Sequence, residues 1–205
     1  MKKYIVIAAM LATTTAFATD LPNKNTAPAA PAAKVSSDSL SVTYGQDLGT
    51  NFGAKVDDAY GVSYKHNIGG GLSVGAAAST TQAPSSQLNQ NLEGQVGYAL
   101  PAMAGVTLSG KAGVGQRFST TNFPYYALYG NADYKIGPIT INALQYRYRS
   151  AIDSAANGYQ SHQLGTGVTY DINDTYSVSA KVTRSYDTSY NATGDAITGG
   201  LTIKF

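Results

Sequence analysis

Hydrophobic and polar residues alternate along most of the chain from Asp38 to Phe205. The stretch Ser39–Tyr44 (SLSVTY) shows the scheme, with apolar side chains at every second position and hydroxyl groups between them. Successive side chains of a β-strand point to opposite faces, so this period of two is typical of strands with one apolar and one polar face. The pattern returns in segment after segment up to the last residue.

One segment departs from the alternation. The apolar residues of Ile139–Ile141 share one parity, whereas Leu144 and the tyrosines that follow it take the other. A β-bulge inserts one extra residue into a strand and restores the apolar face after such a change. We therefore predict a bulge near Asn142–Leu144, without which Arg147 and Arg149 would point to the apolar side.

Turn signals divide the alternating region into hairpins. Tight links containing Gly or Asp fall at 69–71, 102–105, 136–138 and 173–174, and longer polar links fall between them at 82–91, 119–122, 150–158 and 187–194. This predicts an antiparallel up-and-down all-β fold of about ten strands, within a range of eight to twelve. An even number of strands places both ends of the alternating region beside the tight turns.

Aromatic residues gather near both ends of the expected strands. Beside the tight turns and the last residue lie Tyr64, Tyr98, Tyr134, Tyr170, Tyr176 and Phe205. Beside the longer links lie Tyr126, Tyr146, Tyr148, Tyr159 and Tyr186. Two aromatic girdles, short periplasmic turns and modest extracellular loops are typical of a transmembrane β-barrel, which has no open edge for lipid to meet. A soluble β-sandwich is the alternative, but its polar face would favour larger charged residues.

Composition adds the domain organisation. Among 205 residues, 13% are charged and none is Cys, and no apolar run reaches the ~20 residues of a membrane-spanning helix. Lys2 and Lys3 precede a short apolar run and Ala16-Phe17-Ala18, which predicts a secretory signal peptide over 1–18 and export from the cytoplasm. The Pro- and Ala-rich segment 19–37 is expected to be a flexible periplasmic tether, and 38–205 the barrel.

Net charge gives no reason to expect a nucleic-acid partner. The chain has 14 basic and 12 acidic residues. Removal of Lys2 and Lys3 with the signal peptide would leave equal numbers of the two, and so a net charge of about zero. Nucleic-acid-binding domains are usually strongly basic. We therefore expect no nucleic acid to bind.

The C-terminal segment Ala196–Phe205 (AITGGLTIKF) resembles the terminal strand of Gram-negative outer-membrane β-barrel proteins, a small porin-like class. The resemblance implies a place in the outer membrane, surrounded by its lipid and lipopolysaccharide. It also implies that the barrel-assembly machinery reads this strand. The residues to which that signal corresponds are Ile197, Leu201, Ile203 and Phe205.

The polar face is expected to line the lumen. Its candidate residues are Lys55, Asp57, Glu93, Gln95, Lys111, Asp133, Lys135, Gln145, Arg147, Arg149, Lys181 and Lys204. Basic residues prevail, so a narrow pore would favour anions. We predict passive diffusion of small hydrophilic solutes or ions. The alternative is a non-conducting structural or adhesive barrel, because ion pairs between the same residues would plug a small lumen.

Catalysis has weak support in the sequence. His66 and His162 are the only imidazole bases, and the strand pattern places them at opposite ends of the barrel. Ser161 and His162, with Asp153 in the adjoining link, form the one conceivable nucleophile constellation. No cluster has the spacing of metal ligands. We expect no enzyme activity, no cofactor and no metal, and the pattern leaves the oligomeric state open.

Overall fold

The structure is a computed structural model that describes residues 38–82, 88–152 and 159–205. The expected signal peptide 1–18 and tether 19–37 lie outside the described residues. The strands are β1 (Asp38–Leu48), β2 (Lys55–Gly69), β3 (Leu72–Gln82), β4 (Leu88–Ala99), β5 (Val106–Phe118), β6 (Phe123–Ile136), β7 (Ile139–Ala151), β8 (Gln160–Asp171), β9 (Tyr176–Tyr186) and β10 (Ala192–Lys204).

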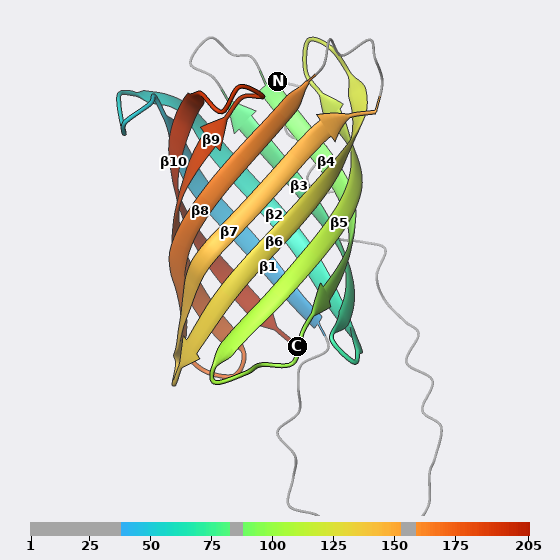
Figure 1. Cartoon of the computed structure of the whole chain (residues 1–205), viewed down its shortest axis with the longest axis vertical. Helices are drawn as coiled ribbons and strands as arrows, with labels where there is room; N and C mark the ends of the chain where they lie inside the picture. The colour runs from blue at the N-terminus through green and yellow to red at the C-terminus, as the bar shows by residue number, and fades with distance from the viewer. Residues whose placement is uncertain (1–37, 83–87, 153–158) are drawn as a thin grey trace, which may run out of the picture. The chain divides into compact units, whose positions relative to one another are not determined.

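Each strand pairs antiparallel with its neighbours in the chain, and β1 pairs with β10, so the sheet closes into a barrel (Figure 1). The seam ends in two backbone hydrogen bonds: Asp38 N donates to Phe205 O at 3.1 Å, and Phe205 N donates to Asp38 O at 3.0 Å. The prediction of an up-and-down antiparallel barrel with ten strands is confirmed. Among the described residues, no helix is long and apolar enough to cross a membrane.

The predicted β-bulge is present in β7. Ala132 of β6 pairs with Leu144, whereas the next residue, Asp133, pairs with Asn142, so Ala143 is the extra residue. The register between β7 and β8 shifts at the same place. The bulge puts Arg147 on the inner face of the barrel, where a straight strand would have turned it outward.

The two ends of the barrel differ less than the sequence suggests. One end of the barrel holds the first residue of β1 and the last residue of β10, and we call it the turn end. There the strands are joined by the links 70–71, 100–105, 137–138 and 172–175. At the opposite end, the loop end, the links are 49–54, 83–87, 119–122, 152–159 and 187–191. The expected alternation of short turns and longer loops is therefore only partial, because the link 100–105 is longer than the link 119–122.

Backbone amides organise the link between β9 and β10. Asp187 Oδ1 accepts hydrogen bonds from Ser189 N at 2.8 Å and from Asn191 N at 2.9 Å. The Asn191 amide, followed by the Asn191 side chain and the Ser189 amide, holds the pKa of the Asp187 carboxyl below its usual range. The carboxylate thus acts as the hub of this turn.

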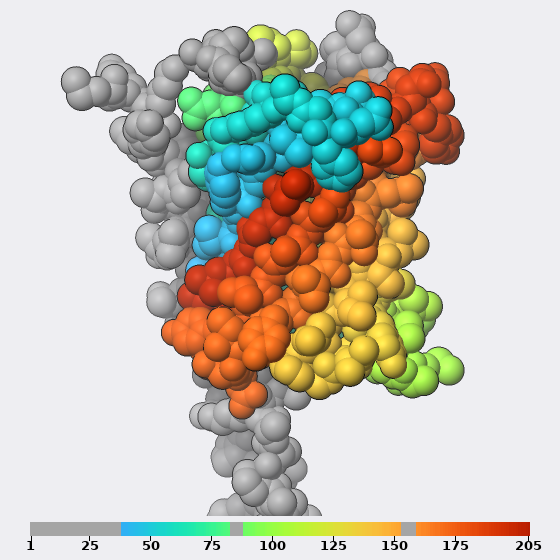
Figure 2. Space-filling model, turned by 90° about the vertical axis from the view of Figure 1, so that its left-hand side faces the viewer, coloured from blue at the N-terminus to red at the C-terminus, as the bar shows by residue number. Residues whose placement is uncertain are grey.

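The link between β1 and β2 folds over the outer surface at the loop end (Figure 2). Phe52 N donates to Asp195 Oδ2 at 2.9 Å, and Asp195 also binds Arg184 of β9, with Oδ1 2.6 Å from Arg184 Nε. Asn51 and Phe52 both have positive φ, at 59° and 54°. We call this group of contacts, which joins the Phe52 amide to the side chains of Asp195 and Arg184, the loop clasp.

Candidate functional site

The outer face of the barrel is an apolar band. Val42, Val96, Leu128, Leu164 and Leu201 come from five different strands, and each is 41 to 55% exposed. At the turn end this band carries Tyr98, Tyr134, Tyr170, Tyr176 and Phe205, each 41 to 62% exposed. Tyr64 lies in the same region, and its hydroxyl donates to Asp38 Oδ1 at 2.8 Å. All six residues of the expected turn-side girdle are therefore at this end of the strands.

Aromatic rings also gather on the outer face at the loop end. The Tyr126 and Tyr148 rings are 5.9 Å apart, the Tyr146 hydroxyl lies 2.7 Å from His162 Nδ1, and Tyr186 pairs with His162 in register. His162 also stacks on Tyr190, with ring centroids 5.1 Å apart. Neither His162 nor Tyr190 was among the residues predicted for this girdle, although the even parity that His162 shares with Leu164 would have placed it there.

The structure places Tyr159 inside the barrel, not in the outer girdle. Its ring packs on Phe123 at 5.0 Å, and its hydroxyl accepts a hydrogen bond from Arg117 Nη1 at 3.3 Å. Phe123, Tyr125 and Ala127 are buried on the same side of the interior. A small internal hydrophobic core therefore occupies the lumen beside β6, toward the loop end.

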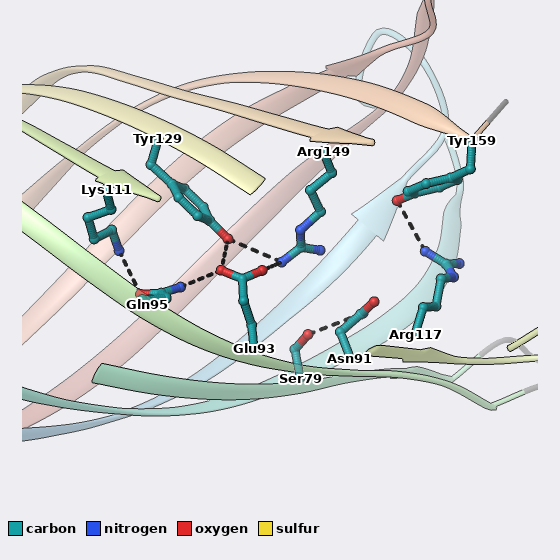
Figure 3. A network of polar contacts seen from close by, with 9 residues as sticks. All are labelled: Ser79, Asn91, Glu93, Gln95, Lys111, Arg117, Tyr129, Arg149 and Tyr159. Atoms are coloured by element: carbon teal, nitrogen blue, oxygen red, sulfur yellow. Dashed lines mark hydrogen bonds and ion pairs between the residues drawn. The ribbon is translucent and has the colours of Figure 1, made fainter. Parts of the chain in front are cut away.

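A network of polar contacts centred on Glu93 crosses the interior (Figure 3). Glu93 Oε2 lies 3.2 Å from Arg149 Nη2, and Glu93 Oε1 accepts hydrogen bonds from Gln95 Nε2 at 2.7 Å and from the Tyr129 hydroxyl at 2.5 Å. Lys111 Nζ joins the network by donating to Gln95 Oε1 at 3.3 Å. These side chains come from β4, β5, β6 and β7, so the network fills that side of the lumen.

Glycines in β5 leave the space that this network occupies. A Cβ on Gly113 would lie 2.7 Å from Glu93 Oε1, and a Cβ on Gly115 would lie 2.7 Å from Tyr125 Cζ. Both distances are shorter than van der Waals contact allows. Tyr125 and Tyr129 occupy odd-numbered positions of β6, as the polar residues Asn131 and Asp133 do. This shared parity in the sequence is the pattern from which the inward direction of the two tyrosines could have been predicted.

A second ionic group lies at the turn end of the lumen. Asp171 Oδ1 is 2.7 Å from Lys204 Nζ, and its Oδ2 is 3.2 Å from Lys135 Nζ. Asp133 Oδ1 accepts a hydrogen bond from Asn142 Nδ2 at 2.8 Å. Asp171 is therefore shared by two lysines, and Asp133 beside them balances the remaining positive charge.

Five further cations on the inner wall have no ion-pair partner among the described residues. They are Lys65, Lys111, Arg117, Arg147 and Lys181. Lys65 is exposed, and the other four are partly exposed. Arg147 Nε is buried without a hydrogen-bond partner in the described part of the chain. Lys111, Arg147 and Lys181 were among the residues predicted to line the lumen, whereas Lys65 and Arg117 were not.

The remaining candidates are distributed around the wall. Gln145 pairs in register with Asn131 and Gly165, and Asp57 pairs with Asp47. The structure places Lys55 outside the lumen: its ammonium binds Asp58 Oδ2 at 2.7 Å, and Asp58 Oδ1 accepts a hydrogen bond from the outward-facing Tyr44. A register shift in β2 beside Leu48 reverses the parity at this point.

The described residues do not assemble the conceivable nucleophile constellation. Ser161 and His162 are consecutive residues of β8, so their side chains point to opposite faces. Asp153 lies outside the described residues. His66 pairs with Asp38 at the turn end, whereas His162 lies among the loop-end aromatic rings. Within the described ranges, no group of three or more His, Cys, Asp or Glu side chains could hold a metal ion.

The fold and its polar interior define a closed, ten-stranded antiparallel barrel with a predominantly basic inner wall. Three solved structures are similar to this chain. The NanC porin is 11% identical, with 81% of this chain and 100% of that chain covered and a TM-score of 0.47, and the KdgM porin is 14% identical, with 82% and 99% covered and a TM-score of 0.43. Neisserial surface protein A is 14% identical, with 82% of this chain and 96% of that chain covered and a TM-score of 0.39. No protein-family model matches the sequence, and no curated protein matches it.

Proposed function

We propose that the protein is an outer-membrane barrel that allows small hydrophilic solutes or ions to diffuse passively through a narrow lumen. The exposed apolar band and the outward aromatic rings at both ends support a place in a bilayer. The closed strand order supports it as well, because a sheet without edges satisfies all its backbone groups within lipid. In this proposal the turn end faces the periplasm, and the surrounding partners are membrane lipid and lipopolysaccharide.

The observation that supports permeation most directly is the state of the inner cations. Lys111, Arg147 and Lys181 face inward and are partly exposed, although no carboxylate among the described residues pairs with them. Burying an unpaired charge in a dry, packed interior is costly, so side chains of this kind favour a lumen that holds water. A narrow watery path with a positive wall would favour anions over cations.

The Glu93 network restricts the same path and favours a second candidate function. Glu93 is only 2% exposed, and Tyr125 beside it is fully buried, so the β4–β7 side of the lumen is filled. The alternative is a non-conducting structural or adhesive barrel, in which such side chains close the whole cross-section. A catalytic role has less support than either, because Ser161 and His162 face opposite ways.

Single-channel recording of the refolded chain in a planar bilayer with asymmetric KCl tests the proposal. We expect small discrete current steps and a reversal potential that shows anion preference. Arg147→Met should reduce that preference because it removes an inner cation, whereas Lys55→Met, which removes a cation from the outer face, should leave it unchanged. Silence from a heat-modifiable, correctly folded barrel would reject permeation and favour the plugged alternative.

A further inference from the structure

A cavity of about 140 Å³ opens from the inner wall in the turn-end half of the barrel. Its walls come from β1 to β5, and among its lining residues are Lys65, Lys111, Ser41, Ser63, Ser73 and Gln95. It borders the Glu93 network, because Gln95 and Lys111, the outer members of that network, line it, while Gln95 lies between Lys111 and the carboxylate of Glu93. Among the described residues, no acidic side chain lines this cavity.

The two lysines bring positive charge to the cavity from opposite sides. Lys65 stands on β2 and Lys111 on β5, and both line the cavity. Neither has an ion-pair partner among the described residues. Lys111 donates one hydrogen bond to Gln95 Oε1, and an ammonium group has three hydrogens to donate. Donors therefore remain on both lysines.

Serine hydroxyls line the cavity together with these lysines. The hydroxyl of Ser41 lies 2.8 Å from Thr202 Oγ1, and that of Ser73 donates to the Gly97 carbonyl at 3.5 Å. Ser41 and Ser63 face each other across β1 and β2, and Ser73 lies beside Gly97, whose other neighbour is Lys111. A hydroxyl group rotates to donate to whichever acceptor is near. The cavity thus presents cationic and neutral donors together, which is the combination that holds an anion with several oxygen atoms.

Glycines keep the space between the lysines open. A Cβ on Gly97 would lie 2.9 Å from Lys111 Cγ and 2.9 Å from Ser73 Oγ, and a Cβ on Gly75 would lie 2.5 Å from the Tyr64 carbonyl oxygen. Any larger residue at either position would push the wall inward. The absence of side chains here is part of the shape of the cavity.

We propose that this cavity is a binding site for a small multivalent oxyanion of the phosphate type. The ammonium groups of Lys65 and Lys111 bind its oxygen atoms from two sides, and Ser41, Ser63 and Ser73 supply neutral hydrogen bonds. The site goes beyond the proposed diffusion function, because it requires access only from the turn end of the lumen and not a path through the whole barrel.

Titration of the refolded, ¹⁵N-labelled chain in detergent micelles with inorganic phosphate, at constant ionic strength in chloride, tests the site. We expect saturable shifts of the Gly75 and Gly97 amide signals. Lys65→Met and Lys111→Met, which keep the length of the side chain, should each weaken binding about tenfold or more, because each removes a charge-assisted hydrogen bond. Lys181→Met removes an inner cation outside the cavity and should change the affinity less than about twofold.

Gly97→Ala adds a variant that changes shape without changing charge, and it should weaken phosphate binding in a barrel that still shows heat-modifiable mobility. Shifts that do not saturate, or equal affinity in the wild type and in Lys65→Met and Lys111→Met, would overturn the site. Channel recording is independent of this result. Currents without saturable binding reject only the site, and saturable binding in a silent barrel rejects only the diffusion function.

Discussion

Glu93 and Arg149 meet across the interior from strands that are not neighbours, with Glu93 Oε2 3.2 Å from Arg149 Nη2. Glu93 stands on β4 and Arg149 on β7, and β5 and β6 lie between them in the sheet. The Tyr129 hydroxyl, from β6, donates to Glu93 and accepts a hydrogen bond from Arg149 Nη2 at 3.4 Å. The ion pair therefore links β4 to β7 across a curved section of the wall. It also narrows the lumen, because both side chains lie in the interior.

Glu93→Gln should both destabilise the barrel and raise its anion preference. The substitution leaves Arg149 buried without its anion, which costs about 3 kcal/mol for a broken buried pair. Urea unfolding followed by heat-modifiable mobility measures the loss, and the reversal potential measures the selectivity. Asp133→Asn removes an equal charge from an acid whose partner, among the described residues, is the neutral Asn142 amide, so it should shift the selectivity with a smaller loss of stability. Equal stability losses in both variants would contradict the bracing role.

Leu164→Arg should destabilise the barrel, because a cation on the lipid face costs up to about 2–4 kcal/mol at the bilayer midplane and less toward the interface. Leu164 is 41% exposed on the outer face. The matched control is Ser79→Arg, since Ser79 faces inward, is exposed and contacts Asn91 there. Unfolding in urea within lipid vesicles gives both values. Equal costs at the two positions would show that the assignment of faces is wrong.

Much of the fold follows from the period of two in the sequence, because each strand must present one face to lipid and one to the lumen. Even the bulge was predictable, since Arg147 and Arg149 would otherwise face outward. Lys55 was assigned to the wrong face because the register shift beside Leu48 leaves no mark in the composition. Tyr159 was placed by its aromatic character, although it shares the parity of the inward Ser161.

The filling of the lumen was not predictable in the same way. Parity places Glu93, Tyr129 and Arg149 on the inner face, but only the curvature and stagger of the strands bring these three side chains into contact. The cavity beside Lys65 likewise depends on which glycines of neighbouring strands fall side by side. Such contacts are set by the three-dimensional register, which the hydrophobic pattern of one strand does not contain.

Asp195→Ala should release the link 49–54 from the outer wall. It removes the acceptor of Phe52 N and the anion bound to Arg184, the contacts that hold two residues with positive φ. Amide exchange at Phe52 should accelerate about tenfold or more once its hydrogen bond is gone. Asp187→Ala is the control, because it should accelerate exchange at Ser189 and Asn191 without affecting Phe52. Unchanged protection of Phe52 in Asp195→Ala would rule out the loop clasp.

Phe205→Asp should impair assembly in the cell more than refolding in detergent. The seam bonds between Phe205 and Asp38 are made by backbone groups, so the substitution leaves them possible. The side chain of Phe205 is 62% exposed, where a charge disfavours lipid and alters the proposed assembly signal. The yield of heat-modifiable protein from outer membranes, compared with the refolded yield, separates the two effects, with Phe205→Tyr as the control. A parallel decrease in both yields would indicate a structural role alone.

Deletion of Ala143 should prevent the barrel from folding, because it removes the bulge. The bulge keeps the apolar residues on both sides of it on the outer face of β7. With Asn142 still paired to Asp133, every later residue of the strand would turn to the opposite face. Arg147 and Arg149 would then face the lipid, at a cost that rises with depth to about 2–4 kcal/mol at the midplane, and Glu93 would lose its partner. Ala143→Gly keeps the chain length and should refold nearly as well as the wild type. We expect the deletion variant to show no heat-modifiable species after refolding into detergent or vesicles. A normal folded yield would mean that the register can adjust elsewhere, and that the bulge is not what keeps the arginines inside.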